Sequence, residues 1–235
     1  MSASLFLVGV GTGDPELLTL KAVRVLSEVK IIAYGQKPNT PSFSLEIAKL
    51  HLRKDVRFLP IDIPMKIERE PAKNAYDNLA KTMLRYLEQG KDVAYLCEGD
   101  PLFYASAMYL ISRMKKDINI EIISGITSIA ASSAAIKRPL CARNEIFKVL
   151  PAPLENEVIL AELETAQAVA IIKVGRHFMR IKSLLEKSGH AENAMIIENA
   201  SGVNERIISL NEYSKNELPY FASILCYKGD EKWGK

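Results

Sequence analysis

Two short phrases built from the same three residues could form walls of a ligand site. Gly13-Asp14-Pro15 and Gly99-Asp100-Pro101 each follow an apolar run and precede a helical pattern. Glycine permits a positive φ and close backbone approach, aspartate can cap a helix, and proline suits the first helical position. The phrases indicate either two strand-to-helix turns at a ligand-binding edge of a parallel sheet or two well-formed turns without a ligand.

The first turn does not match the common phosphate-binding patterns. In Gly9-Val10-Gly11-Thr12-Gly13-Asp14, the third glycine of a G-x-G-x-x-G fingerprint falls on Asp14, whose carboxylate would meet a pyrophosphate. Tyr34-Gly35 stands where the ribose-binding acid is expected, and no G-K-[S/T] phrase occurs in the sequence. An acidic, glycine-rich turn suits a ligand with hydroxyls and positive charge. S-adenosylmethionine, with its ribose and sulfonium, fits that description.

A third phrase of this kind is Gly125-Ile126-Thr127-Ser128, again between a strand pattern and a helical pattern. Its two hydroxyl residues suit a third wall of the same site. They equally suit the capping of the helix that follows, which is a common role for serine and threonine.

The first half of the chain alternates apolar strand patterns with helical ones. The segment 15–28 places Leu18, Ala22, Val25 and Leu26 on one helical face. Continuous apolar strands separated by helices indicate a parallel sheet covered on both faces. The expected strands are 5–10, 30–34, 56–59, 92–97 and 118–123, and the expected helices are 15–28, 42–52, 72–89 and 102–114.

The pattern changes after residue 124, where a small-residue helix at 126–136 begins a second α/β domain. Because the last strand patterns lack intervening helices, this second sheet is expected to be mixed. We therefore predict an α/β protein of two domains, 1–124 with a mainly parallel sheet and 125–235 with a mixed sheet. The second domain is expected to hold strands 146–150, 168–173, 194–198, 206–210 and 220–227, and helices 155–164 and 177–188.

Composition excludes several classes of function. Of 31 basic and 28 acidic residues, 17 and 15 lie in residues 1–124 and 14 and 13 in the remainder, so no basic tail points to nucleic acid. The three cysteines, Cys97, Cys141 and Cys226, are scattered and lack a histidine at metal-ligand spacing, which predicts a reducing compartment and no metal site. No signal peptide pattern is present, and the longest uncharged run is too short and polar to span a bilayer. We expect a cytoplasmic protein without a membrane partner.

Four longer phrases resemble the tetrapyrrole methylase family of S-adenosylmethionine-dependent enzymes. They are GVGTGDPELLTLKAVRVL at 9–26, AYLCEGDPLFYASAMYL at 94–110, GITSIAAS at 125–132 and IIKVGRH at 171–177. The resemblance covers nearly the whole chain, in order and at the expected spacing. It implies the two-domain class III methyltransferase fold, a homodimer, S-adenosylmethionine as methyl donor without a metal, and a site in the cleft between the domains.

Within the family, the second and fourth phrases most resemble enzymes that methylate carbon 20 of precorrin-2 or its cobalt-bearing equivalent in cobalamin biosynthesis. Gly35 replaces an aspartate found in uroporphyrinogen III methyltransferases. Two alternatives remain: methylation of another carbon of a corrin precursor, and non-catalytic binding of S-adenosylmethionine or a tetrapyrrole.

The resemblance assigns roles to individual positions. Asp14 and Pro15 are placed on the substrate side, together with the basic residues Arg69, Arg143, Arg176 and His177, which could bind tetrapyrrole carboxylates. A proton must leave the methylated carbon, and its acceptor is not identified; Glu98 and Tyr104 are candidates beside structural roles as a turn carboxylate and a core-edge phenol. His51 and His190 are expected on the surface. The positions that match cofactor contacts are Thr12, Glu98, Gly99, Asp100, Phe103, Thr127, Ser128, Val174 and Ala200.

Overall fold

The computed structural model describes residues 3–63 and 70–228. The chain divides into two compact units, Met1–Thr127 and Ser128–Lys235, here called unit 1 and unit 2. The division falls close to the boundary expected between residues 124 and 125. Each unit has its own sheet and its own hydrophobic core.

Unit 1 is built on a five-stranded sheet in the order β3-β2-β4-β1-β5. Every strand pair in it is parallel, as expected from the alternation of strands and helices. All the carboxyl ends of the strands therefore lie at one edge of the sheet. The strands are β1 (Ser4–Gly9), β2 (Ile31–Gln36), β3 (Arg57–Asp62), β4 (Val93–Cys97) and β5 (Asn119–Ile123).

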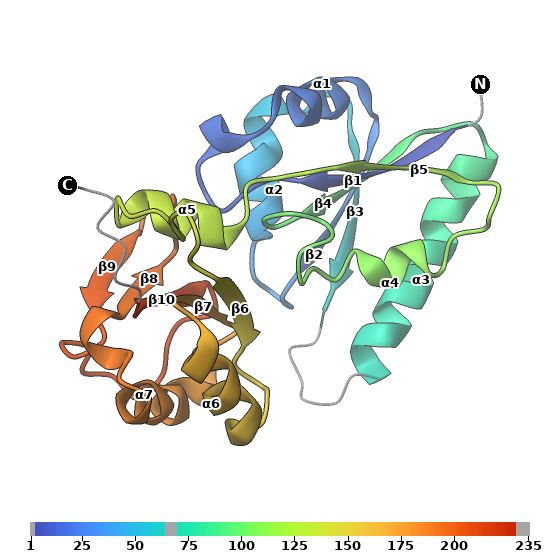
Figure 1. Ribbon diagram of the computed structural model, residues 1–235. Coiled ribbons are helices and arrows are strands. Elements are labelled where there is room, and N and C mark those ends of the chain that lie inside the picture. The colour runs from blue at the N-terminus through green and yellow to red at the C-terminus, as the bar shows by residue number, and fades with distance from the viewer. Residues whose placement is uncertain (1–2, 64–69, 229–235) are drawn as a thin grey trace. The chain divides into compact units, whose positions relative to one another are not determined.

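Helices cover both faces of this sheet (Figure 1). Alternate side chains of one strand point to opposite faces, so Leu5 and Leu7 of β1 join one core and Val8 joins the other. The first core packs against α3 (Glu70–Glu88) and α4 (Met108–Ile111). The second packs against α1 (Leu20–Glu28) and α2 (Phe43–Ala48), which continues into the 3₁₀ turn η2 (Lys49–His51).

Two expected helices of unit 1 differ from the structure in their extent. The segment expected as one helix at 15–28 is a 3₁₀ turn, η1 (Pro15–Leu17), followed by α1, because Leu18 is extended and the Thr19 side chain caps α1 by accepting from the N–H of Ala22. The expected helix 102–114 shortens to α4. Tyr104 has a φ of 54°, a left-handed conformation that interrupts a right-handed helix.

Unit 2 contains the expected mixed sheet, in the order β6-β7-β10-β8-β9. β6 and β7 are parallel, and the other pairs are antiparallel. One face packs against α6 (Asn156–Thr165) and α7 (Phe178–Lys187). On β10, Ser223 shares a 2.8 Å hydrogen bond with Ser132 of α5 (Ser128–Ala135). The strands are β6 (Phe147–Pro151), β7 (Ala168–Ile172), β8 (Met195–Glu198), β9 (Arg206–Ser209) and β10 (Ala222–Tyr227).

The prediction that His190 lies on the surface is wrong. His190 precedes the 3₁₀ turn η4 (Ala191–Asn193), its side chain is fully buried, and its Nδ1 shares a 2.9 Å hydrogen bond with Ser188 Oγ. The neighbouring Gly189 turns the chain inward with a φ of 74°. Among residues 3–63 and 70–228, no helix has the length and apolar character that a membrane crossing requires.

Candidate active site

The strand order of unit 1 creates a switch point between β1 and β4. The chain leaves β1 toward β2 through α1 on one face of the sheet, and leaves β4 toward β5 through α4 on the opposite face (Figure 1). In open α/β sheets, ligands bind outside the carboxyl ends of the strands at such a point. The turns that follow β1 and β4 are the two Gly-Asp-Pro phrases, so the topology places both at this position.

Backbone contacts join these turns to the phrase after β5. Gly11 and Gly99 form an isolated antiparallel bridge, with Gly99 N–H donating to Gly11 O at 2.7 Å. A Cβ added to Gly125 would lie 2.2 Å from Gly99 O, and one added to Gly9 would lie 2.6 Å from Gly125 N. Side chains at Gly9 and Gly125 would therefore collide with backbone, so at these glycines the main chains of the three turns lie directly against one another.

The two aspartates of the repeated phrase form different hydrogen bonds. Asp14 accepts from the N–H of Glu16 at 2.8 Å, which caps only its own turn, η1. Asp100 accepts from the N–H of Leu102 at 2.9 Å and from the N–H of Gly125 at 3.1 Å. The Asp100 carboxylate therefore fastens the turn after β4 to the turn after β5.

Glu98 lies at the end of β4 beside the start of α2. Glu98 as a residue is exposed, but its carboxyl is hydrogen-bonded to Ser44; desolvation raises the pKa of this carboxyl and the hydrogen bonds lower it. Ser44 Oγ lies 3.1 Å from Ser42 Oγ, which donates to Gly35 O at 2.7 Å. Glu98 is thus one end of a series of hydrogen bonds that links the carboxyl ends of β2 and β4.

Phe103 and Tyr104 occupy the loop between β4 and α4. Their rings form an edge-to-face pair with centroids 5.1 Å apart, and the Tyr104 side chain is 42% exposed. The left-handed backbone of Tyr104 is uncommon for a bulky residue, and such conformations concentrate at functional sites. The loop therefore presents an aromatic pair at the switch point.

The remaining cofactor positions expected in unit 1 are two threonines. Thr12 is half-buried between Gly11 and Gly13, whose φ angles are 77° and 155°. Thr127 is half-buried and ends unit 1, whereas the exposed Ser128 begins α5 in unit 2.

Val174 and Ala200 are brought to one edge of the sheet of unit 2. They follow β7 and β8, both of which run antiparallel to the intervening β10, so their carboxyl ends lie at the same edge. Both residues are buried. The neighbouring residues Lys173, Asn199 and Ser201 have φ angles of 56°, 50° and 61°. Because non-glycine residues rarely adopt this conformation, the edge carries concentrated backbone strain of the kind found at ligand sites.

The turn after β8 is supported by an acid that the sequence interpretation did not single out. Glu198 is buried and accepts from Tyr213 Oη at 2.8 Å, with Arg206 3.9 Å from its other oxygen. Burial and this carboxylate raise the pKa of Tyr213 to about 12. The sequence did contain a signal for this role, since Glu198 follows the apolar run Met195-Ile196-Ile197. A carboxylate at the end of a buried strand needs a hydrogen-bond or charge partner.

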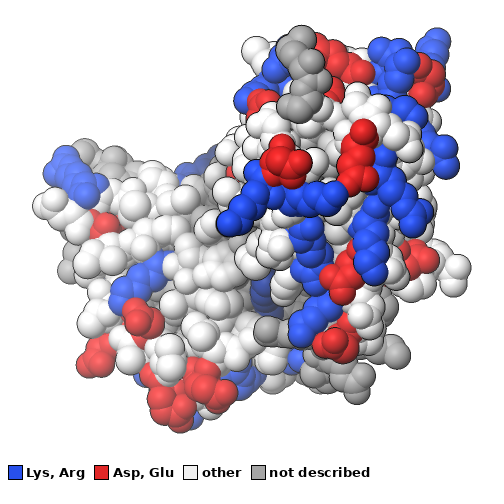
Figure 2. Space-filling model, turned by 90° about the vertical axis from the view of Figure 1, so that its right-hand side faces the viewer, with Lys and Arg blue, Asp and Glu red and all other residues white. Residues whose placement is uncertain are grey.

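The basic residues expected to bind substrate are not all brought together. Arg176 and His177 form η3 (Gly175–His177), directly after β7, and burial together with Arg180 and Arg176 lowers the pKa of His177. Arg143 precedes β6, which is parallel to β7, and so lies at the opposite edge of that sheet. Arg69 lies outside the described residues. On the face shown in Figure 2, Lys and Arg side chains lie next to Asp and Glu side chains.

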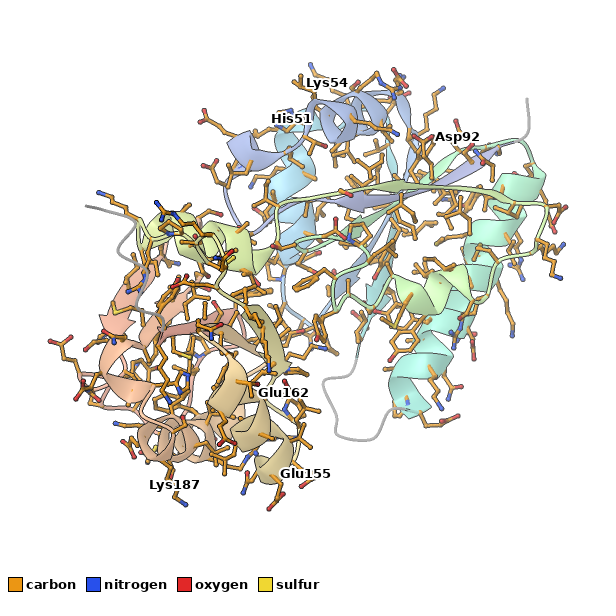
Figure 3. The ribbon with its side chains drawn as sticks, in the orientation of Figure 1. His51, Lys54, Asp92, Glu155, Glu162 and Lys187 are labelled. Carbon is orange, nitrogen blue, oxygen red and sulfur yellow. The ribbon has the colours of Figure 1, made fainter. Side chains whose placement is uncertain are left out.

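Other charged groups lie away from the turns. Lys54 and Asp92 precede β3 and β4, and with the half-buried His51 they belong to the amino-terminal side of the sheet of unit 1 (Figure 3). Glu162 of α6 pairs with Lys148 of β6 at 2.6 Å. Within the described part of the chain, no three His, Cys, Asp or Glu side chains are grouped so that they could hold a metal ion.

Comparison with known proteins identifies the family of this chain. Residues 4–214 match the family described as Tetrapyrrole (Corrin/Porphyrin) Methylases. The chain belongs to the tetrapyrrole methylase family. The expected resemblance and the expected two-unit α/β fold are thereby confirmed.

Curated members of the tetrapyrrole methylase family are similar over most of this chain. The cobalamin biosynthesis protein CobIJ of Mycobacterium bovis is 34% identical over 96% of the chain and 46% of its own length, so the chain spans about half of that relative. A precorrin-2 C(20)-methyltransferase of Sinorhizobium sp is 33% identical over 93% of the chain and 92% of its own length.

A solved structure in the same family shares the fold. Uroporphyrin-III C-methyl transferase from Thermus thermophilus, complexed with S-adenyl homocysteine, superposes with a TM-score of 0.67 at 22% identity. The match covers 96% of this chain and 98% of that one.

Proposed function

We propose that this protein transfers the methyl group of S-adenosylmethionine to carbon 20 of precorrin-2 or of its cobalt-bearing equivalent, in cobalamin biosynthesis. The observation that carries the proposal is the convergence of the turns after β1, β4 and β5 at the switch point of unit 1. The similarity to the Sinorhizobium enzyme directs the proposal to carbon 20.

The residues at the switch point fit the methyl donor. Gly11 and Gly99 carry no side chain, so the methionine and ribose portions can approach the main chain of these turns closely. The nearby carboxylates of Glu98 and Asp100 suit hydroxyls and a sulfonium rather than a phosphate. In unit 2, Val174 and Ala200 at the strained edge stay proposed as contacts of the adenine.

Bound S-adenosylmethionine supplies a methyl group that is already activated by its positive sulfur. The task left to this chain is alignment, because the meso carbon of a reduced tetrapyrrole is an electron-rich, enamine-like nucleophile. Orientation of two bound reactants contributes about 7–11 kcal/mol to lowering a barrier. Turns whose main chains lie directly against one another, as those at Gly9, Gly99 and Gly125 do, suit such a task because backbone contacts leave little room for rearrangement.

The substrate carboxylates require positive groups on the protein. We propose Arg176 for this role and His177 beside it as a neutral hydrogen-bond donor, since both follow the same strand as Val174. Arg143 lies at the other edge of that sheet, so we propose that it binds a different part of the substrate. Arg69, Asp14 and Pro15 stay proposals on the substrate side, as do the homodimer and the cytoplasmic location.

Incubation with precorrin-2 and a donor carrying a ¹³C-labelled methyl group tests the proposal. We expect a new methyl signal at carbon 20 by NMR. Label at another carbon would indicate methylation of a different corrin position, and tight donor binding without transfer would indicate a carrier. Asp100→Ala serves as the matched control, since it should reduce labelling without changing its position.

A further inference from the structure

Two buried phenols and one half-buried serine hydroxyl form a chain at the loop that follows β4. Tyr95 of β4 and Tyr76 of α3 are 3% and 2% exposed, within the apolar cluster that also contains Leu5, Leu7 and Met83. The two phenols are hydrogen-bonded to each other, and Tyr76 Oη donates to Ser106 Oγ at 2.6 Å. The site described above uses none of these three residues.

The order of donors in this chain follows from its chemistry. Tyr76 gives its single hydroxyl proton to Ser106, so it accepts the proton of Tyr95. Burial raises the pKa of both phenols, which keeps them protonated at neutral pH and preserves this order. Burying phenols in an apolar core is unfavourable without partners, and a fully paired polar network rigidifies the part of the core that holds it.

The chain ends on the loop that carries the aromatic pair. Ser106 follows Tyr104 by two positions and begins the turn that leads into α4. At its other end, the loop is fixed by Asp100, which accepts from Leu102 and Gly125. The left-handed Tyr104 therefore stands between two anchors, one made by a carboxylate and one by a buried hydroxyl.

We infer that Ser106, held by Tyr76 and Tyr95, is a positioning residue for methyl-donor binding. It acts through the loop Asp100–Ser106 and sets the place of Phe103, and the inference rests on the proposed function. The hydroxyl chain supplies the energy that keeps Tyr104 in its unfavourable conformation when no ligand holds the loop.

Binding of S-adenosylhomocysteine, measured by calorimetry, tests the inference without requiring turnover. Loss of the part-buried Tyr76–Ser106 hydrogen bond weakens the ordered loop, so Ser106→Ala and Tyr76→Phe should each raise the Kd about tenfold. Ser106→Thr keeps the hydroxyl and should stay within about threefold of the wild type. Tyr86→Phe removes a phenol from the same helix, where the ring lies under Arg57, and should leave the Kd unchanged.

A double-mutant cycle separates positioning from general destabilisation. Because Ser106 and Tyr76 act through one hydrogen bond, the double variant should bind no more weakly than the weaker single variant. Amide hydrogen exchange in residues 99–107 should accelerate in Ser106→Ala, while exchange in β1 stays unchanged. If Tyr76→Phe does not fold, Ser106→Ala and its threonine rescue decide the question.

The outcomes distinguish this inference from the proposed function. Wild-type protein that does not bind S-adenosylhomocysteine overturns the proposed function. Wild-type binding with a Kd unchanged in Ser106→Ala, or with losses that simply add in the double variant, overturns the inference alone.

Discussion

The Asp100 carboxylate accepts a hydrogen bond from the N–H of Gly125 at 3.1 Å, although the two residues belong to turns that follow different strands. The same carboxylate also accepts from Leu102 within its own turn. Asp100 is therefore the side chain that fixes the spacing between the turns after β4 and β5. A residue with this position shapes the site whether or not it touches the ligand.

Asp100→Ala should weaken S-adenosylhomocysteine binding more than Asp14→Ala. The first variant leaves two backbone N–H groups without an acceptor, at a cost of about 1–3 kcal/mol for each group that stays buried. The second removes only a local cap, worth about 1 kcal/mol. Calorimetric titration of both variants gives the comparison, and equal losses would contradict it.

Gly125→Ala should destabilise unit 1 severely. The added methyl would meet Gly99 O at 2.2 Å and Gly9 C at 2.8 Å, both of them backbone atoms that cannot rotate away. Overpacking of this kind costs about 1–3 kcal/mol or more. Gly90→Ala is the control, because its φ is 73° but no atom lies within 4 Å of the added Cβ. Urea unfolding should show the larger loss for Gly125→Ala, and a larger loss for Gly90→Ala would refute the steric account.

Glu98→Gln separates a structural role for this residue from proton acceptance. The amide keeps an oxygen that can accept from Ser44, so the link between β4 and α2 should survive. We expect methyl transfer to fall less than about tenfold, whereas loss of a proton acceptor would lower the rate about 10²–10⁴-fold. The measurement is the single-turnover rate of methyl transfer at saturating S-adenosylmethionine. A large fall with unchanged donor binding would identify Glu98 as the acceptor.

Buried His190 should make unit 2 less stable in mild acid. Burial lowers its pKa, and Lys228 lowers it further, so the folded state favours the neutral ring. The unfolded state then binds the proton more readily, and stability falls as the pH drops below the unfolded-state pKa of about 6.5. The slope for one such group reaches about 1.4 kcal/mol per pH unit.

Urea midpoints between pH 7.5 and 5 measure this dependence. His190→Asn should flatten it, whatever its effect on the stability at neutral pH. A free energy of unfolding of the wild type that stays constant between pH 7.5 and 5 would contradict the prediction.

Much of the fold could be predicted because its elements obey short-range rules. Apolar runs such as Leu5–Val8 and the spacing of Ala22, Val25 and Leu26 determine strands and helix faces directly. The mixed sheet of unit 2 followed from strands that lack helices between them. The ends of elements were less predictable, because a left-handed Tyr104 and an extended Leu18 depend on tertiary contacts.

The site was only partly accessible from sequence for a similar reason. The phrases predicted where the turns are. They did not predict that the main chains at Gly9, Gly99 and Gly125 lie against one another. Nor did they predict that Arg143 and Arg176 lie at opposite edges of one sheet. These relationships depend on strand order, which local patterns do not specify. The burial of His190 and Glu198 escaped notice because a single polar residue carries no periodic signal.

The strand order also governs how the chain behaves while it is being synthesised. β1 has β4 on one side and β5 on the other, so during synthesis it stays unpaired until residues 93–97 and 119–123 have been made. During that interval Leu5, Leu7 and Val8 have neither a sheet partner nor a core. Long-range pairing of this kind is slow and leaves apolar segments exposed to aggregation. Translation speed between residues 10 and 93 should therefore affect the yield of folded protein more than speed in the codons of unit 2.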